Sequence, residues 1–251
     1  MPAVIGVIPA RLNSQRFPAK ALAPLSGKPL LYYIWRRALR AKSLDCLVIA
    51  TDSKRIARVA EDFGANVILT TNRPRNGSER TAEVACSITG GYFVNIQGDN
   101  LVFSPGWIDT GVRALKSNRT RKFHTLVTAI RSSGEMENHS RVKVAVLGAG
   151  PGRRAGWFSR SPLPCVKPNK ISEDWRRFRC YKHIGVYFYR RSGLELYQSW
   201  KPGRYEKAES LEQLRILEHG ESIGVSVVSG ASIVIDSERD LKNATRFAKL
   251  R

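Results

Sequence analysis

Three cations lie in one short loop near the start of the sequence. Arg11, Arg16 and Lys20 are spaced five and four residues apart, after an apolar, β-branched run that predicts a buried strand over 3–8, ending at Pro9. Loops at the carboxyl ends of parallel strands are where α/β sheets bind ligands. Guanidinium and ammonium groups bind phosphate oxygens, so these side chains can converge on one polyanion. The alternative is a solvated basic loop.

Two aspartates are candidate metal ligands. Asp99 directly follows an apolar stretch that predicts a buried strand over 92–97. A carboxylate at that point can bind Mg²⁺ beside triphosphate oxygens. Asp236 follows a second apolar run over 232–235, where capping of the next helix is the alternative. The sequence contains neither a Walker loop nor a G-x-G-x-x-G stretch, so side chains would hold most of any phosphate.

Two further stretches favour structural roles when considered alone. Asn76 to Arg80 lies at a predicted helix start, where Asn is a favourable cap and Glu a favourable first-turn residue. His183 borders a predicted strand, where a lone His is more often structural. No Ser-His-Asp order and no H-E-x-x-H motif occurs, which argues against hydrolase and zinc-protease chemistry.

The elements that would position these residues alternate between strand and helix. Apolar runs predict strands over 3–8, 46–51, 66–70, 92–97 and 124–130, and helical periodicity predicts helices over 29–41, 54–63, 78–88 and 105–115. This alternation favours a mostly parallel α/β sheet. Beyond about residue 131 the pattern changes: strands over 142–147 and 184–189 flank a stretch rich in Pro, Arg and Lys. A helix over 206–218, a strand over 223–228 and a helix over 237–249 follow. We expect one domain, 1–251, with an inserted lobe at about 131–190.

The composition restricts the protein class. The 251 residues, 42% of them hydrophobic, suit one large or two small domains, and no apolar run approaches the ~20 residues of a membrane span. No charged-then-apolar leader is visible, so we expect a soluble, cytoplasmic protein. The four cysteines show no C-x-x-C spacing, which argues against a zinc site or a disulfide framework.

The net charge of +21 has two interpretations. It is typical of nucleic-acid binding or of an enzyme whose field attracts anionic substrates. The cations are spread along the chain, and no zinc finger or RNA-binding aromatic motif accompanies them. We therefore expect anionic small molecules, rather than nucleic acid, to be the main partners, and we expect no membrane partner.

Several motifs occur in the order of a known family and span essentially the whole chain. The most specific are Ile8-Pro-Ala-Arg-Leu-Asn-Ser-Gln-Arg-Phe-Pro-Ala-Lys20 and Gln97-Gly-Asp99. Others lie at 27–29, 50–52, 77–84, 142–144, 158–164, 182–187, 209–215 and 234–241. With these stretches the sequence resembles the CMP-Kdo synthetases, the 3-deoxy-manno-octulosonate cytidylyltransferase family. The resemblance implies a nucleotide-binding, Rossmann-like sheet with helices on both faces, an inserted dimerisation lobe, a homodimer and a role in lipopolysaccharide biosynthesis.

The resemblance also implies roles for individual residues. Arg11, Arg16 and Lys20 would hold the CTP triphosphate, with Asp99 completing the catalytic set. Asp99 and Asp236 would bind Mg²⁺. The nucleoside would lie against Ala10, Ser78 and Arg80. The residues lining the sugar-acid pocket would be Gln97, Arg160, His183, Tyr187, Glu209 and Glu212.

The sequence departs from the family pattern at four places. Asn100-Leu101 replaces the usual Glu-Pro, and Pro18-Ala-Lys-Ala21 replaces Pro-Gly-Lys-Pro. Arg204-Tyr205-Glu206 replaces Pro-Leu-Glu, and the loop after Arg160 is basic instead of acidic. Three alternatives therefore stay open: transfer of CMP to another acid (a nonulosonate, a modified octulosonate or a phosphonate), a non-catalytic nucleotide- or polyanion-binding relative, and nucleic-acid binding.

Overall fold

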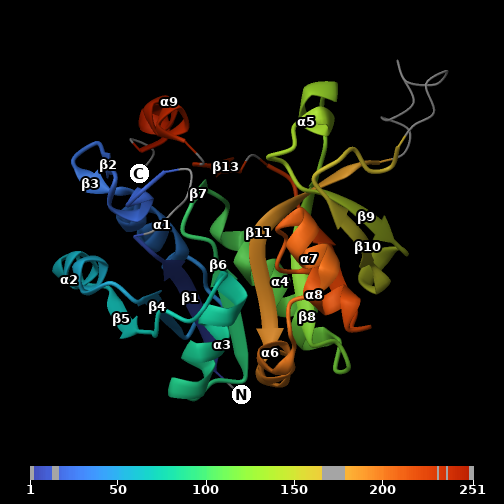
Figure 1. Cartoon of the computed structure of the whole chain (residues 1–251), viewed down its shortest axis with the longest axis horizontal. Helices are drawn as coiled ribbons and strands as arrows, with labels where there is room; N and C mark the ends of the chain where they lie inside the picture. Colours follow the sequence, from blue (N-terminus) through green and yellow to red (C-terminus); the bar gives the residue numbers. More distant parts are fainter. Residues whose placement is uncertain (1–2, 13–16, 166–178, 231, 236, 249–251) are drawn as a thin grey trace.

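A large β-sheet forms the centre of the fold. The computed structural model describes residues 3–12, 17–165, 179–230, 232–235 and 237–248. Within these residues the sheet contains β1 (Val4–Ala10), β4 (Cys46–Thr51), β5 (Asn66–Leu69), β6 (Tyr92–Ile96), β8 (Phe123–Ala129), β9 (Lys143–Leu147), β10 (Arg154–Ser159), β11 (Tyr181–Arg190) and β12 (Ile223–Val227). These strands lie in the order β5-β4-β1-β6-β11-β8-β12-β10-β9 (Figure 1).

The sheet is mixed, so the expectation of a mostly parallel sheet is wrong. β5, β4, β1 and β6 are parallel, as the alternating strands and helices predict. β11 then runs antiparallel between β6 and β8, and β10 and β9 are antiparallel at the far edge. Parallel neighbours require a crossover connection. The strand–helix alternation that supplies such crossovers stops near residue 131. Beyond that residue β9, β10 and β11 make antiparallel pairs, although β12 still pairs parallel with β8.

Helices cover both faces of the sheet. They are α1 (Leu30–Ala38), α2 (Lys54–Asp62), α3 (Gly77–Ser87), α4 (Pro105–Ser117), α5 (Ser133–Glu137), α6 (Arg191–Ser199), α7 (Arg204–Glu209), α8 (Leu214–Glu218) and α9 (Glu238–Ala248). β1 shows how the two cores are divided, because its side chains alternate. Val4 and Ile8 pack with residues of α1, α2 and α4, whereas Ile5 and Val7 pack with residues of α3, α6 and α8.

Helix starts follow the local sequence signals. Pro29 is the N-cap of α1, where its missing N–H costs no helical hydrogen bond. The Ser53 hydroxyl accepts a hydrogen bond from the Ile56 N–H at 3.3 Å, and the Asn76 carbonyl oxygen accepts one from the Glu79 N–H at 2.8 Å. These contacts confirm the predicted starts of α2 and α3, and each cap contributes about 1 kcal/mol.

Other local predictions are wrong. β1 continues through Pro9, which pairs with Ala50 on β4. β1 pairs with β6 only as far as Val7, so beyond that point it has one neighbour, as an edge strand does, and a proline is tolerated. The helix expected over 206–218 is two helices, α7 and α8, because Ser210 adopts a left-handed φ of 52°. The strand β10 and the helix α6 were not predicted.

Several short elements complete the side of the molecule that carries the opening loop. The 3-10 helix η1 (Lys20–Leu22) leads into a hairpin of β2 (Pro24–Leu25) and β3 (Lys28–Pro29). β7 (Asn100–Val102) pairs with β13 (Ile233–Val234), so the residues after β6 lie beside the residues before α9. Figure 1 shows α9, β2 and β3 on one side of the molecule and α5, β9 and β10 on the other. Every helix in the described ranges is too short or too polar to cross a bilayer.

Candidate active site

A cleft of about 650 Å³ opens at the carboxyl ends of β1 and β6. At this point the Lys20 ammonium group donates hydrogen bonds to Asp99 Oδ2 and to the Ile235 carbonyl oxygen, both at 2.9 Å. Three segments far apart in the sequence therefore meet at one cation. Ile235 directly precedes Asp236, which lies outside the described residues, as does Arg16.

Two backbone features fix this meeting point. Gly98 lies so close to β1 that a Cβ there would be 2.7 Å from the Pro9 carbonyl oxygen, so only glycine lets the Asp99 loop approach. On the other side, Ala19 adopts a left-handed φ of 53°, and its N–H donates to the Leu12 carbonyl oxygen at 2.8 Å. The turn at Ala19 aims Lys20 back toward Asp99.

The residues predicted to bind the triphosphate and the nucleoside differ in exposure and in how strongly the rest of the protein holds them. Arg11 is exposed at the mouth of the cleft, and its guanidinium reaches the Arg75 carbonyl oxygen at 3.4 Å. Ala10 and Arg80 line the cleft wall. Arg80 is nevertheless 3% exposed and tied to the protein, through Thr70 Oγ1 and an ion pair with Asp52 at 3.4 Å.

Ser78 lies one layer deeper. It is 1% exposed, and its hydroxyl is 2.5 Å from the Tyr189 hydroxyl. Its N–H, at the start of α3, donates to Glu212 Oε2 at 3.2 Å. Ser78 thus connects the start of α3 to the opposite wall of the cleft.

Five of the six predicted sugar-acid residues line the cleft: Gln97, Arg160, His183, Tyr187 and Glu212. Tyr187 donates to Gln213 Oε1 at 3.1 Å, and His183 Nε2 is 2.8 Å from Thr125 Oγ1. Gly185 makes room for one of them, because a Cβ there would be 2.8 Å from Gln97 Oε1.

Arg160 and Glu209 support the wall from behind. The Glu209 carboxylate accepts hydrogen bonds from Ser159 Oγ at 2.7 Å and from the Arg160 N–H at 2.9 Å. The Arg160 guanidinium donates to three backbone carbonyls, those of Glu209 at 2.8 Å, His139 at 3.2 Å and Ser210 at 3.4 Å. Arg160 therefore uses its donors within the protein although it borders the cleft.

Burial determines two charge states in the cleft. Burial lowers the pKa of His183 from 6.5 to about 3, so this imidazole is neutral at physiological pH. Burial raises the pKa of Glu212 from 4.5 to about 7, while hydrogen bonds from Ser78 and Gly77 act in the opposite direction. The Glu212 carboxyl can therefore be neutral or charged near pH 7.

Comparison with known proteins decides the family. A cytidylyltransferase family model matches residues 5–223. A 3-deoxy-manno-octulosonate cytidylyltransferase of Geobacter sulfurreducens is 38% identical over 251 residues, covering 98% of this chain and 99% of the relative. The chain belongs to the 3-deoxy-manno-octulosonate cytidylyltransferase family.

Further relatives of this family agree. The corresponding protein of Chlorobium phaeobacteroides is 41% identical over 222 residues, which cover 88% of this chain and 86% of that protein. A solved structure of CMP:2-keto-3-deoxy-manno-octonic acid synthetase in complex with CTP superposes with a TM-score of 0.88 at 31% identity, covering 99% of both chains. A cytidylyltransferase structure from Leptospira borgpetersenii, 16% identical with a TM-score of 0.63, shares the fold.

A buried network of ion pairs, which was not predicted from the sequence, lies behind the cleft. Arg215 is 1% exposed, and its guanidinium donates to both carboxylate oxygens of Glu206 at 2.6 and 2.7 Å and to Glu79 at 2.8 Å. It also lies 4.3 Å from the centre of the Tyr197 ring. Arg215 is the last residue of the 209–215 motif. The motif therefore included this residue, but it did not reveal that Arg215 forms buried ion pairs. The network joins α3 to α7 and α8 across the base of the cleft.

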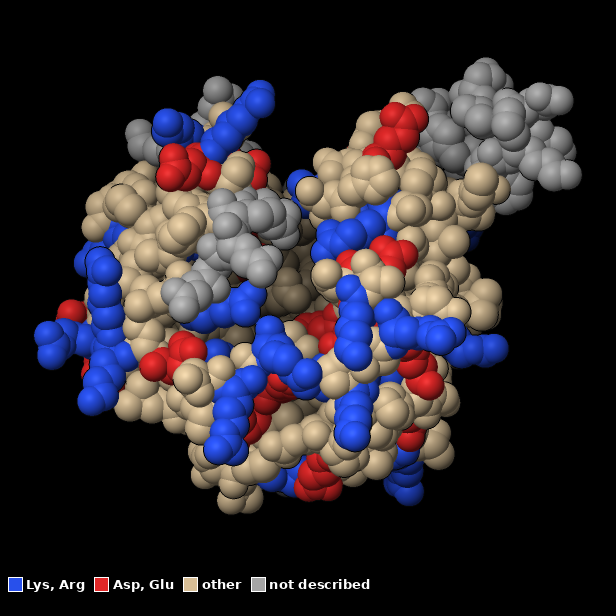
Figure 2. All heavy atoms as spheres, viewed as in Figure 1, with Lys and Arg blue, Asp and Glu red and all other residues tan. Residues whose placement is uncertain are grey.

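The mouth of the cleft is positively charged. Figure 2 shows the hollow between the two sides of the molecule, with Lys and Arg side chains around its mouth and acidic side chains within it. A field of this sign raises the local concentration of anions and speeds their association. Attraction of anionic substrates is therefore one functional reason for the +21 net charge.

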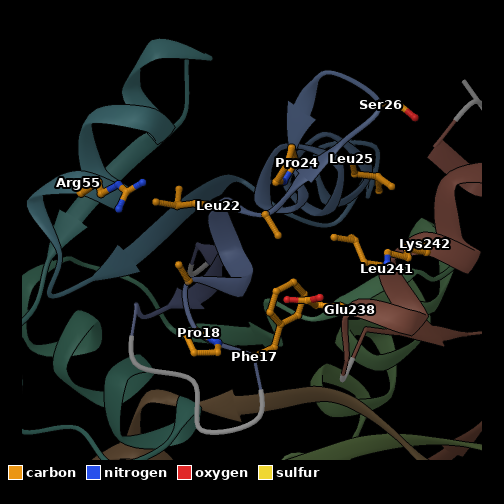
Figure 3. A pocket seen from close by; sticks show the side chains of 12 residues that line it. Phe17, Pro18, Leu22, Pro24, Leu25, Ser26, Arg55, Glu238, Leu241 and Lys242 are labelled. Atoms are coloured by element: carbon orange, nitrogen blue, oxygen red, sulfur yellow. The ribbon is translucent and has the colours of Figure 1, made fainter.

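An apolar cavity of about 490 Å³ lies behind the opening loop. Figure 3 shows Leu22, Leu25 and Leu241 facing this hollow, between η1, the β2–β3 hairpin and α9. Phe17 lines both this cavity and the cleft. Packing around Phe17 therefore bears on the position of Lys20, three residues further along the chain.

The described residues can offer part of a metal site. They contain no group of three or more His, Cys, Asp or Glu side chains placed to hold an ion. Asp99 Oδ1, however, is buried and has no hydrogen-bond partner among them, while Oδ2 binds Lys20. A lone carboxylate oxygen suits Mg²⁺, which in proteins is often held by one or two carboxylates plus substrate phosphates. Asp99 therefore fits the divalent metal that such cytidylyltransferases generally use.

Proposed function

We propose that this protein transfers CMP from CTP to 3-deoxy-manno-octulosonate (Kdo), releasing pyrophosphate. The contact between Lys20 and Asp99 carries the proposal, because it brings a phosphate-binding cation and a metal-binding carboxylate to one point of the cleft. The relatives of about 37% identity over the full length, named for this activity, support the choice of CTP and Kdo.

In the proposed reaction the anomeric hydroxyl of the sugar acid attacks the α-phosphorus of CTP, and pyrophosphate leaves. Lys20, Arg11 and Arg16 hold the triphosphate and stabilise the charge that grows on the leaving group. Asp99 and the Ile235 carbonyl hold the Lys20 ammonium in place, so little reorganisation is needed during the reaction. Positioning and charge neutralisation supply most of the rate in such in-line displacements.

Mg²⁺ is the proposed metal, with Asp99 and Asp236 as its protein ligands. When bound, it acts as a Lewis acid on phosphate oxygens and can lower the pKa of the attacking hydroxyl. The buried, unpartnered Oδ1 of Asp99 supports this assignment.

The two substrates take opposite ends of the cleft. Ala10, Ser78 and Arg80 are proposed around the nucleoside. The sugar acid is proposed against Gln97, His183, Tyr187 and Glu212, with Arg160 and Glu209 holding that wall. Buried atoms of Glu212 (Oε1) and Gln213 (Nε2) have no partner among the described residues, which suits binding of a polyhydroxylated substrate.

We also propose a cytoplasmic homodimer that associates through the lobe at about 131–190. Leu147 on β9 supports this, because it is 45% exposed on that lobe. Sedimentation equilibrium should give twice the monomer mass. Leu147→Asp should shift the protein toward monomer, whereas a dimer unaffected by this change would place the interface elsewhere.

The test of function is pyrophosphate release from CTP and Mg²⁺, with and without Kdo. We expect release that depends on Kdo and falls at least 100-fold in Asp99→Ala, whereas Asp62→Ala, at an exposed position on α2, keeps the wild-type rate. CTP binding without release would contradict the proposal and favour a non-catalytic relative. Release only with another acid, from a panel of nonulosonates and phosphonates, would reassign the acceptor.

A further inference from the structure

The loop between α5 and β9 borders the sugar-acid end of the cleft. Ser140, Arg141 and Val142 line the cleft there. The loop is a tight turn, in which the Arg141 N–H donates to the Asn138 carbonyl oxygen at 2.9 Å and the Ser140 N–H donates to Asn138 Oδ1 at 2.8 Å. The backbone at Arg141 is thus locally fixed.

A buried lysine holds this turn from below. Lys143 is 0% exposed, and its ammonium group donates to the carbonyl oxygens of Asn138 at 2.9 Å and Arg141 at 2.6 Å. No carboxylate forms an ion pair with Lys143 within the described ranges. Burying an ammonium group is costly unless its hydrogen bonds are made, so its two carbonyl partners are held in place as well.

Arg160 holds the same turn from the side. Its guanidinium donates to the His139 carbonyl oxygen at 3.2 Å and also to the carbonyls of Glu209 and Ser210. Lys143 and Arg160 therefore fix the turn against the end of α7. The side-chain hydrogen bonds of both cations to described residues all go to backbone oxygens.

Arg141 itself has a free guanidinium. It is half-buried on the cleft wall and makes no side-chain hydrogen bond or ion pair with any residue that the structure describes. Glu135 interacts with it electrostatically, but that carboxylate already binds the Lys182 ammonium and the Arg131 N–H. A planar fork of donors thus borders the cleft, and no described residue is bonded to it.

The charges around the turn favour an anion. Arg141, Lys143 and Arg160 contribute three positive charges, against the carboxylates of Glu209 and, when it is ionised, Glu212 in the described part of this wall. His183, on the adjacent strand, is neutral. The local field is therefore positive where the sugar acid is proposed to lie.

We infer that Arg141 is a specificity-determining residue that binds the carboxylate of the acceptor, and that Lys143 is the positioning residue that aims it. The inference rests on the proposed function, since it requires a sugar acid in this end of the cleft. A bidentate bond between guanidinium and carboxylate would select acids over neutral sugars of the same size.

The test compares the acid with its uncharged form. kcat/KM is measured for Kdo and for Kdo methyl ester at saturating CTP, with the inhibition constant against Kdo used for the ester if its turnover is too slow. Arg141→Ala should lower kcat/KM for Kdo about 10- to 100-fold, leave the ester value unchanged and leave the KM for CTP unchanged. Arg141→Lys should restore part of the loss. Arg131→Ala, an exposed arginine of the same lobe, is the matched control.

The role of Lys143 is tested through Arg141. Lys143→Met should lower kcat/KM for Kdo in the wild-type background but cause little further loss in Arg141→Ala, because it acts by placing the same guanidinium. If the fold-losses of Lys143→Met and Arg141→Ala multiply in the double variant, Lys143 has a merely structural role. If Lys143→Met does not fold, Lys143→Arg replaces it.

Equal losses for acid and ester, or no loss in Arg141→Ala, would overturn the inference while leaving the proposed function intact. Absence of Kdo-dependent pyrophosphate release by the wild-type protein would instead contradict the proposed function itself.

Discussion

Glu212 makes the stability of this protein depend on pH in a defined direction. Burial raises its pKa from 4.5 to about 7 in the folded protein. An acid with a higher pKa in the folded state binds more protons there than in the unfolded chain. The free energy of unfolding therefore falls as pH rises from about 4.5 to about 7. This rise in pKa corresponds to at most about 3 kcal/mol of folding stability. The figure is an upper limit because one side of Glu212 borders the cleft, where solvent weakens the effect.

The perturbation is Glu212→Gln, which keeps the size of the side chain and removes its ionisation. We expect Glu212→Gln to exceed the wild type in free energy of unfolding by up to about 3 kcal/mol at pH 8.5 and by much less at pH 5. Urea unfolding followed by tryptophan fluorescence at several pH values measures this difference. Glu61→Gln, at an exposed position on α2, controls for the loss of one negative charge.

A stability difference that stays constant between pH 5 and 8.5 would refute this reasoning. It would mean that the hydrogen bonds from Ser78 and Gly77 outweigh burial and keep the carboxylate charged throughout.

Three further predictions concern the supports of the cleft. Ala19→Gly should raise the free energy of unfolding by about 0.5–1 kcal/mol in urea unfolding, because it relieves a left-handed alanine; a loss of stability would contradict this. Arg215→Met should lower the free energy of unfolding by about 3–5 kcal/mol, because Glu206 and Glu79 would keep buried charges without a cation; a change below 1 kcal/mol in the same assay would contradict it. The His183 imidazole should show no titration by NMR between pH 5 and 8, and a midpoint in that range would show that the ring is more hydrated than its burial implies.

Much of the first half of the fold could be predicted from sequence because its signals are local. Apolar runs gave the strands of the parallel half, and capping residues such as Ser53 and Asn76 gave the helix starts. The antiparallel placement of β11 could not be predicted, because strand direction depends on the path of the connection and not on the strand's own residues. The break at Ser210 was missed for a related reason: apolar periodicity continues across it, while one backbone angle ends the helix.

Family motifs predicted which residues lie at the site, but not what each side chain contacts there. The motifs directed attention to Lys20 and Asp99, and the fold brings these two side chains within 2.9 Å although 79 residues separate them. They also directed attention to Arg160, but its donors bind three backbone carbonyls. A motif indicates that a residue belongs to the site. Only the hydrogen bonds in the structure distinguish a side chain that can contact substrate from one that stabilises the cleft wall. Among the described residues of that wall, the same geometry points to Arg141, which no motif singled out, as an arginine whose guanidinium makes no bond to the protein and can meet a carboxylate.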